Sequence, residues 1–213
     1  MVNERGFTLV EFLIAALITT AVLGGTVMLA AQLQQAYTTQ LDDVTVEEEA
    51  RFSLEWIEQA LRNAGSNPYS IGASGCAAAT FTAIGIDPDG DSTNDDIRIH
   101  SDINPPNGLL GGVAAACNEL NEDVTIAHDN VNLVITRNEN NDVAGPVVMT
   151  EPVITNLLFT YLDSAGNVTA NPNVVAYVRV TITGKSVPEQ NLYDANDAFT
   201  TTTLQTEVHI RTR

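Results

Sequence analysis

The pattern of hydrophobic and polar positions divides the chain into three parts. The first is an apolar run, in which 20 consecutive residues from Phe12 to Ala31 carry no charge. At about 1.5 Å per residue, a helix of this length spans about 30 Å, the thickness of a bilayer's hydrocarbon core. The run therefore predicts a membrane-spanning helix. Glu11, at its edge, is the only acidic or basic residue between Phe7 and Leu41, and its carboxylate is expected to have a specific partner.

The second part continues the helix but has only one apolar face. Apolar and small residues recur there at three- and four-residue spacing, at Val46, Ala50, Ser53, Leu54, Ile57, Leu61 and Ala64. Trp56 lies on the same stretch, and we expect it to pack rather than to bind a ligand. Asn63-Ala64-Gly65 followed by Pro68 is a helix stop signal. We expect one helix from about Phe7 to Ala64, whose second half packs one face on a folded domain.

The third part changes to a period of two. Alternating stretches occur at residues 97–100, 132–137, 157–161, 174–183 and 202–212, separated by turns rich in Gly, Asn and Asp. Short alternating strands with such turns indicate antiparallel sheet rather than βαβ units. The predicted fold class is therefore α+β: a long N-terminal helix, with a hydrophobic half and an amphipathic half, packed on an antiparallel β-sheet domain.

The residues where the apolar run begins form one contiguous motif. A short polar leader ends at Gly6, and Phe7-Thr8-Leu9-Val10-Glu11 follows directly. A secretory signal has its small-residue cleavage site after the apolar run, whereas cleavage after Gly6 would retain the run and create a new amine on Phe7. Over about 30 residues this segment resembles the class III signal of type IV pilins and type II secretion pseudopilins. An ordinary single-span anchor is the alternative interpretation.

The resemblance implies a course of processing and assembly. It implies cleavage after Gly6 by a prepilin peptidase and N-methylation of Phe7. It further implies assembly into a helical filament, in which Glu11 bonds to the Phe7 amine of a neighbouring subunit. The implied partners are other pilin or pseudopilin subunits, the prepilin peptidase and the inner-membrane assembly platform.

The same resemblance implies three segments and a location. The segments are a prepilin leader at 1–6, a hydrophobic transmembrane or filament-core helix at 7–35 and a periplasmic α+β pilin globular domain at 36–213. Arg5 before the apolar run orients the leader toward the cytoplasm. We therefore expect a single-pass protein of the bacterial inner membrane, which is then incorporated in a pilus or pseudopilus.

The final third of the chain carries a second resemblance, to the PilW-type minor pilins and the J-type pseudopilins. It rests on the turn Tyr161-Leu162-Asp163-Ser164-Ala165-Gly166 and on the strand residues Val208-His209-Ile210-Arg211. It implies a minor type IV pilin, a structural subunit that initiates or caps pilus assembly in twitching motility, adhesion or uptake. Two alternatives stay open: a type II secretion pseudopilin at the pseudopilus tip, and a ligand-binding adhesin module at a pilus tip.

Composition and charge argue against some classes of function. Asp and Glu number 27 against 9 Lys and Arg, and the formal net charge is −18. Such acidity argues against direct nucleic-acid binding, which needs clustered basic residues. The sequence contains no nucleophile elbow, Gly-rich phosphate loop or metal-binding His pair, so we expect no enzyme activity.

The two cysteines, Cys76 and Cys117, predict a disulfide. A location outside the cytoplasm permits disulfides, and two cysteines allow only one intramolecular pairing. A bridge that closes a loop of about 40 residues is worth about 2–4 kcal/mol. Two buried free thiols are the alternative.

An acidic stretch offers one candidate metal site. Asp87, Asp89 and Asp91 alternate around a glycine, which suits Ca²⁺, a hard cation that takes several oxygen ligands from a tightly turning chain. The stretch is not an EF-hand loop, because the glycine precedes the third acid and Arg98 stands where the last glutamate should be. The alternative is an acidic turn that leads into a strand. No other cofactor is expected.

Overall fold

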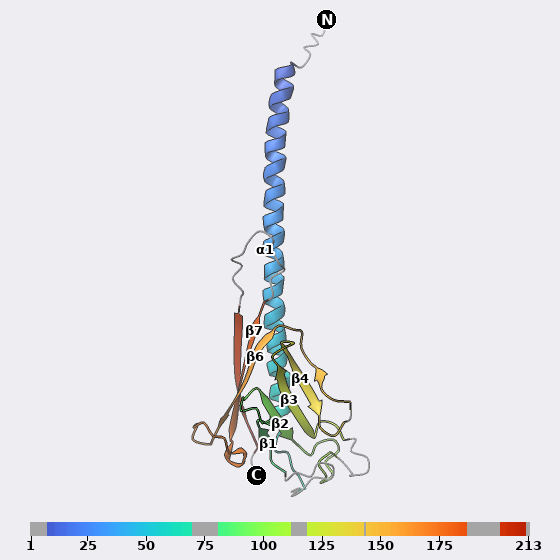
Figure 1. Ribbon diagram of the computed structural model, residues 1–213, viewed down its shortest axis with the longest axis vertical. Coiled ribbons are helices and arrows are strands. Elements are labelled where there is room, and N and C mark those ends of the chain that lie inside the picture. The colour runs from blue at the N-terminus through green and yellow to red at the C-terminus, as the bar shows by residue number, and fades with distance from the viewer. Residues whose placement is uncertain (1–7, 70–80, 112–118, 143, 187–200, 212–213) are drawn as a thin grey trace. The chain divides into compact units, whose positions relative to one another are not determined.

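The computed structural model describes residues 8–69, 81–111, 119–142, 144–186 and 201–211. The chain divides into two compact units, Met1–Asp42 and Asp43–Arg213. One long helix, α1 (Leu9–Asn63), begins in the first unit and ends in the second (Figure 1). The predicted single helix is confirmed, and its end differs from the predicted one by one residue.

The end of α1 is set by glycine. Gly65 has a φ of +74°, which side-chain-bearing residues rarely adopt. A Cβ at this position would lie 2.1 Å from the carbonyl oxygen of Arg211, and the Gly65 N–H donates to the carbonyl of His100 at 3.0 Å. The chain can therefore leave the helix here and pass close to two other segments.

The strands of the second unit form two antiparallel sheets. Five form a meander in which each strand pairs with the next: β1 (Ile84–Ile86), β2 (Asp96–His100), β3 (Asp123–Asp129), β4 (Val134–Glu139) and β5 (Val147–Val148). The other three form a second meander: β6 (Ile154–Leu162), β7 (Tyr177–Lys185) and β8 (Thr201–His209). Figure 1 shows the two sheets beside the C-terminal part of α1. The α+β class is thus confirmed.

One hydrophobic core joins the helix to both sheets. The helix contributes the stripe predicted from its spacing, and Ala50, Ile57 and Leu61 are completely buried. Ile97 and Ile126 come to the same core from the first sheet, and buried residues of the second sheet complete it, among them Leu157, Phe159, Val178, Val180 and Ile182. In the described part of the chain no buried residue precedes Val46, so the core belongs entirely to the second unit.

Three strands and several strand boundaries differ from the sequence prediction. β1, β3 and β5 were not expected. β1 and β5 have only three and two residues, which is too short for a period to show. The stretch expected as a strand from Val174 begins instead with a 3₁₀ turn, η1 (Pro172–Val174). Asn171 caps this turn by accepting the Asn173 N–H at 3.1 Å, and Pro172 supplies a backbone angle that suits a first helical position.

The paired strands β2 and β3 are further connected by a buried ion pair. Asp123 is fully buried, and Arg98 donates to both of its carboxylate oxygens at 2.7 and 2.6 Å. Asn140 Nδ2 donates to Asp123 Oδ1 at 2.7 Å, and His100 Nε2 lies 3.4 Å from the same oxygen. Burial alone would raise the pKa of Asp123, but these neighbours outweigh it and hold the pKa well below its usual range.

Asp123→Asn should lower the free energy of unfolding at pH 7 by about 2–4 kcal/mol, because it leaves Arg98 without its counter-charge at a partly buried site. Since the folded-state pKa of Asp123 is depressed, its contribution is present above about pH 4 and is lost as the pH falls below that value. The free energies of unfolding of wild type and variant should therefore converge as the pH falls toward 2. Urea unfolding of the 36–213 fragment between pH 2 and pH 7 measures both effects.

The matched control is the exposed Arg179–Glu207 pair, which joins β7 and β8 at 3.0 Å with side chains 39% and 42% exposed. Glu207→Gln should lower the free energy of unfolding by less than about 1 kcal/mol, because solvent screens exposed ion pairs. Equal costs for Asp123→Asn and Glu207→Gln would contradict the role given to the buried pair.

Candidate functional site

The start of α1 is closed by reciprocal hydrogen bonds between Thr8 and Glu11. Glu11 Oε2 accepts the backbone N–H and the hydroxyl of Thr8, each at 2.9 Å, and the Glu11 N–H donates to Thr8 Oγ1 at 3.3 Å. This arrangement is a capping box, with Thr8 as the N-cap and Glu11 three residues further on. The Glu11 carboxylate thus has a partner within its own chain. Gly6 and Phe7 lie outside the described residues, so their predicted cleavage and methylation stay predictions.

The helix surface that follows is apolar on all sides and uncovered. The large hydrophobic side chains from Leu9 to Leu33 are 54–75% exposed. By length and composition α1 can cross a membrane. Its hydroxyl groups are satisfied internally: Thr19 and Thr20 donate to the carbonyls of Ala15 and Ala16 at 2.8 and 2.9 Å. A surface of this kind requires lipid or other apolar helices around it.

The loop between β1 and β2 brings three carboxylates together. Asp87, Asp89 and Asp96 each present one carboxylate oxygen, and the three oxygens lie within 4.8 Å of one another. Asp91, which the sequence pattern proposed, is not in this group. Its Oδ1 accepts the backbone N–H and the hydroxyl of Thr93 at 2.7 and 2.6 Å. The candidate set therefore contains Asp96 in place of Asp91.

Asp96 is the buried member of this group. It is only 2% exposed, and its Oδ2 accepts the Asp89 N–H at 3.1 Å. Its Oδ1 is buried and has no hydrogen-bond partner among the described residues. Burial raises the pKa of Asp96 to about 6. Sequence reasoning missed this residue because it follows the alternating acids by several positions, and only the fold of the loop brings it to them.

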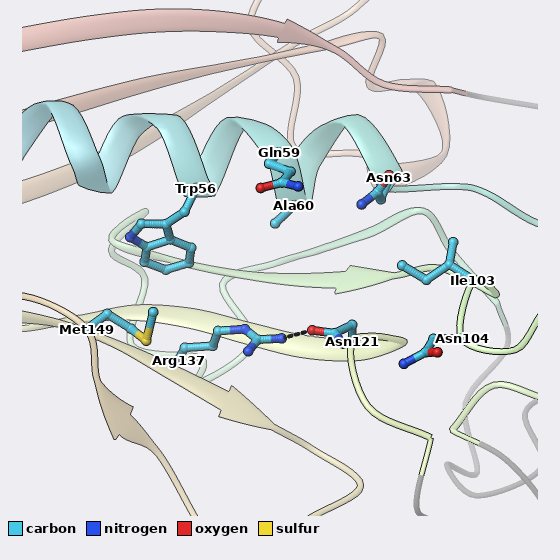
Figure 2. A pocket seen from close by; sticks show the side chains of 9 residues that line it. All are labelled: Trp56, Gln59, Ala60, Asn63, Ile103, Asn104, Asn121, Arg137 and Met149. Atoms are coloured by element: carbon cyan, nitrogen blue, oxygen red, sulfur yellow. Dashed lines mark hydrogen bonds between the residues drawn. The ribbon is translucent and has the colours of Figure 1, made fainter.

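A cavity of about 470 Å³ lies between the C-terminal end of α1 and the five-stranded sheet (Figure 2). Its lining combines one aromatic side chain with several carboxamides: Trp56, Gln59, Ala60, Asn63, Ile103, Asn104, Asn121, Arg137 and Met149. The indole Nε1 of Trp56 is buried and has no hydrogen-bond partner among the described residues. Arg137 donates to Asn121 Oδ1 at 2.5 Å and also pairs with Glu139. Trp56, expected only to pack, thus also lines a cavity with carboxamide groups.

The predicted disulfide cannot be placed in this description. Cys76 and Cys117 both lie outside the described residues, so the bridge stays a prediction.

Comparison with known proteins identifies the N-terminal segment. Residues 1–27 match the family model of the prokaryotic N-terminal methylation motif. No curated protein and no solved structure matches the chain. The matched motif is the class III signal characteristic of type IV pilins and pseudopilins, and the resemblance predicted from residues 6–11 is confirmed. The motif does not distinguish between the pilin subtypes.

The motif and the helix together point to one class of protein. A class III signal implies processing by a prepilin peptidase and assembly with other pilins. The apolar first half of α1 fits membrane anchoring, and the pilin class is structural rather than catalytic. Together these findings support a pilin-like or pseudopilin-like protein.

Proposed function

We propose that this chain is a minor type IV pilin, a structural subunit that initiates or caps pilus assembly. The observation that carries the proposal is the first half of α1: an uncovered apolar helix that begins in a class III signal and contains a single carboxylate, Glu11. The turn at residues 161–166 and the last strand resemble those of minor pilins, and this resemblance supports the choice of a minor subunit.

The mechanism follows from the two surroundings that this helix can occupy. In the inner membrane, lipid covers the apolar side chains from Leu9 to Leu33, and the globular domain of residues 36–213 lies in the periplasm. On assembly the helix leaves the lipid and enters the filament core, where neighbouring helices provide the same apolar cover. The hydrophobic gain is similar in both places, so specific contacts decide whether the transfer occurs.

Glu11 provides such a contact in this proposal. After cleavage behind Gly6, the new Phe7 amine of a neighbouring subunit donates a charge-assisted hydrogen bond to the Glu11 carboxylate and sets the axial register. The pair is favourable because both charges are already removed from water. The bonds from Thr8 engage only Oε2 of Glu11, which leaves Oε1 as an acceptor for the amine.

A type II secretion pseudopilin is the alternative within the same class. It shares the signal, the helix and the antiparallel sheets. Deleting the gene distinguishes the two: loss of piliation and twitching supports the pilin, and retention of exoproteins in the periplasm supports the pseudopilin.

Processing is the first test. The mature protein should have the mass of a chain that begins at Phe7 plus one methyl group, measured by intact-mass spectrometry of assembled filaments. Gly6→Leu should retain the leader, because the peptidase requires a small side chain before the cut. Asn3→Leu, within the leader, should be cleaved normally. Wild-type filaments that still carry Met1 would refute the cleavage.

Glu11 is the second test, and its capping role supplies the control. Glu11→Gln keeps a side chain that can complete the capping box but removes the charge, and Glu11→Ala removes both. If the Phe7 amine needs the carboxylate, the amount of each variant in sheared filaments should fall at least tenfold. Both variants should remain in the membrane fraction. Thr8→Ala, which weakens the cap by about 1 kcal/mol but keeps the charge, should assemble within twofold of wild type.

A register contact and a capping role for Glu11 predict different effects of the three variants on the amount of protein in filaments. A role in capping alone would leave Glu11→Gln close to wild type and would make Thr8→Ala as harmful as Glu11→Ala. Wild-type amounts of Glu11→Gln in filaments would overturn the proposed register contact.

The cavity beside Trp56 favours a second candidate function, ligand binding at the pilus tip. Its volume of about 470 Å³ suits a small ligand. Carboxamides both donate and accept hydrogen bonds, as sugar hydroxyls do, and Trp56 adds an aromatic face. Arg137, the one charged residue of the lining, is already paired with Glu139. A neutral saccharide therefore matches this cavity better than a charged ligand.

A glycan array probed with the 36–213 fragment tests this candidate. At least one neutral saccharide should bind, and Trp56→Leu, which keeps an apolar side chain but removes the aromatic face, should weaken that binding at least fivefold. Phe52→Leu, at a position 53% exposed on the same helix, should bind as wild type does. An array without bound neutral glycans, or unchanged binding by Trp56→Leu, would exclude the saccharide site.

A further inference from the structure

The group formed by Asp87, Asp89 and Asp96 has the dimensions of a cation site. Oxygen ligands lie about 2.3–2.6 Å from Ca²⁺, so two ligands on opposite sides of one ion are about 4.6–5.2 Å apart. The three carboxylate oxygens lie within 4.8 Å of one another, and all three can belong to one coordination sphere. The loop supplies them from two places, the turn directly after β1 and the first residue of β2.

A second observation, independent of the clustering, comes from Asp96. Its side chain is 98% buried, being only 2% exposed, and it contributes an oxygen to the group. Its Oδ1 atom is buried without any hydrogen-bond partner among the described residues. A buried carboxylate oxygen without a partner is costly. Because Asp96 contributes an oxygen to the group, a cation there would bind this buried carboxylate.

The hydrogen-bond donors to the three carboxylates, among the described residues, do not neutralise them. Asp87 accepts the backbone N–H groups of Gly90, Asp91 and Ser92 at 2.9–3.1 Å. Among the residues that the structure describes, the Asp96 side chain accepts only the Asp89 N–H, at 3.1 Å. These donors are uncharged, so the three negative charges repel one another across a short distance. A divalent ion would cancel two of them.

The position of the loop gives such an ion a structural effect. The carbonyl of Asn94 accepts the N–H of Phe159 at 2.7 Å, and the carbonyl of Asp96 accepts the Tyr161 hydroxyl at 3.2 Å. Phe159 and Tyr161 belong to β6 and are buried in the shared core. The loop that carries the acids therefore contacts the second sheet directly, although it belongs to the first.

We propose that Asp87, Asp89 and Asp96 bind one Ca²⁺ ion, which fastens the β1–β2 loop and with it the junction between the two sheets. Ca²⁺ suits the group better than Mg²⁺, because it accepts irregular sets of six to eight oxygens and Mg²⁺ requires near-ideal octahedral geometry. Waters and backbone carbonyls would complete the coordination. The site does not depend on the role of the chain in a pilus.

Calcium titration of the mature full-length protein in detergent tests the proposal. After removal of divalent ions with a chelator, isothermal titration calorimetry with CaCl₂ should show one site with a Kd of about 1 mM or lower, as extracellular Ca²⁺ modules have. The thermal midpoint should rise with CaCl₂, because the ion binds the folded state. NaCl at matched ionic strength should not reproduce the rise, and MgCl₂ should bind at least tenfold more weakly.

Three variants assign the ligands. Asp89→Asn changes an exposed side chain, so the protein should fold and bind Ca²⁺ at least tenfold more weakly. Asp96→Asn should abolish the calcium-dependent rise in the thermal midpoint. Asp91→Asn, in the same loop but outside the group, should change the Kd less than threefold.

Several results would overturn the site. They are no binding heat and no thermal shift at 10 mM CaCl₂, equal affinity for Mg²⁺, or equal weakening by Asp91→Asn and Asp89→Asn. The last two would show general attraction of cations to an acidic loop. If Asp96→Asn fails to fold, the comparison of Asp89→Asn with Asp91→Asn decides.

Discussion

The buried face of α1 between Val46 and Leu61 is the contact on which the second unit depends. Neither sheet can bury its apolar face alone: one has three strands, and the other ends in strands of three and two residues. Ala50, Ile57 and Leu61 are completely buried in a cluster that includes residues of both sheets. The two sheets thus share a single core through the helix, so changes in that face should be felt in both.

The buried carboxylates of the second unit are stabilised in two different ways. Basic residues number only 9 against 27 acidic ones, and the buried carboxylates of the described chain differ in whether they have a basic partner. Asp123 has one, Arg98. Glu122 is also fully buried but is held by the backbone N–H groups of Ile103, Asn104 and Gly111 at 2.8–3.1 Å, and burial raises its pKa. Backbone donors thus replace basic side chains in the loop after β2.

In the first half of α1 the polar groups have hydrogen-bond partners, whereas the apolar side chains are not buried. The capping box of Thr8 and Glu11 and the threonine hydroxyls find their partners within the helix. The apolar side chains from Leu9 to Leu33 find none within the described chain. Such a helix is self-sufficient in hydrogen bonding but not in burial, which is the condition that a bilayer or a bundle of helices satisfies.

Features that depend on local order along the chain could be predicted from the sequence. The class III signal is a contiguous block, the buried stripe of α1 follows helical spacing, and the helix stops two residues before Gly65, whose positive φ is a local requirement. The longer strands, such as β6 and β7, also show their period of two.

The tertiary structure alone decided what depends on residues that are distant in sequence. It divided the strands between two sheets, since an alternating pattern identifies a buried face but not a neighbouring strand. It turned Trp56 into part of a cavity wall by placing Asn121 and Arg137 opposite the helix. It also exchanged Asp91 for Asp96 in the acidic group, because the loop folds back on the start of β2. Spacing along a chain determines local conformation, whereas a site requires distances in space, which only the packed core establishes.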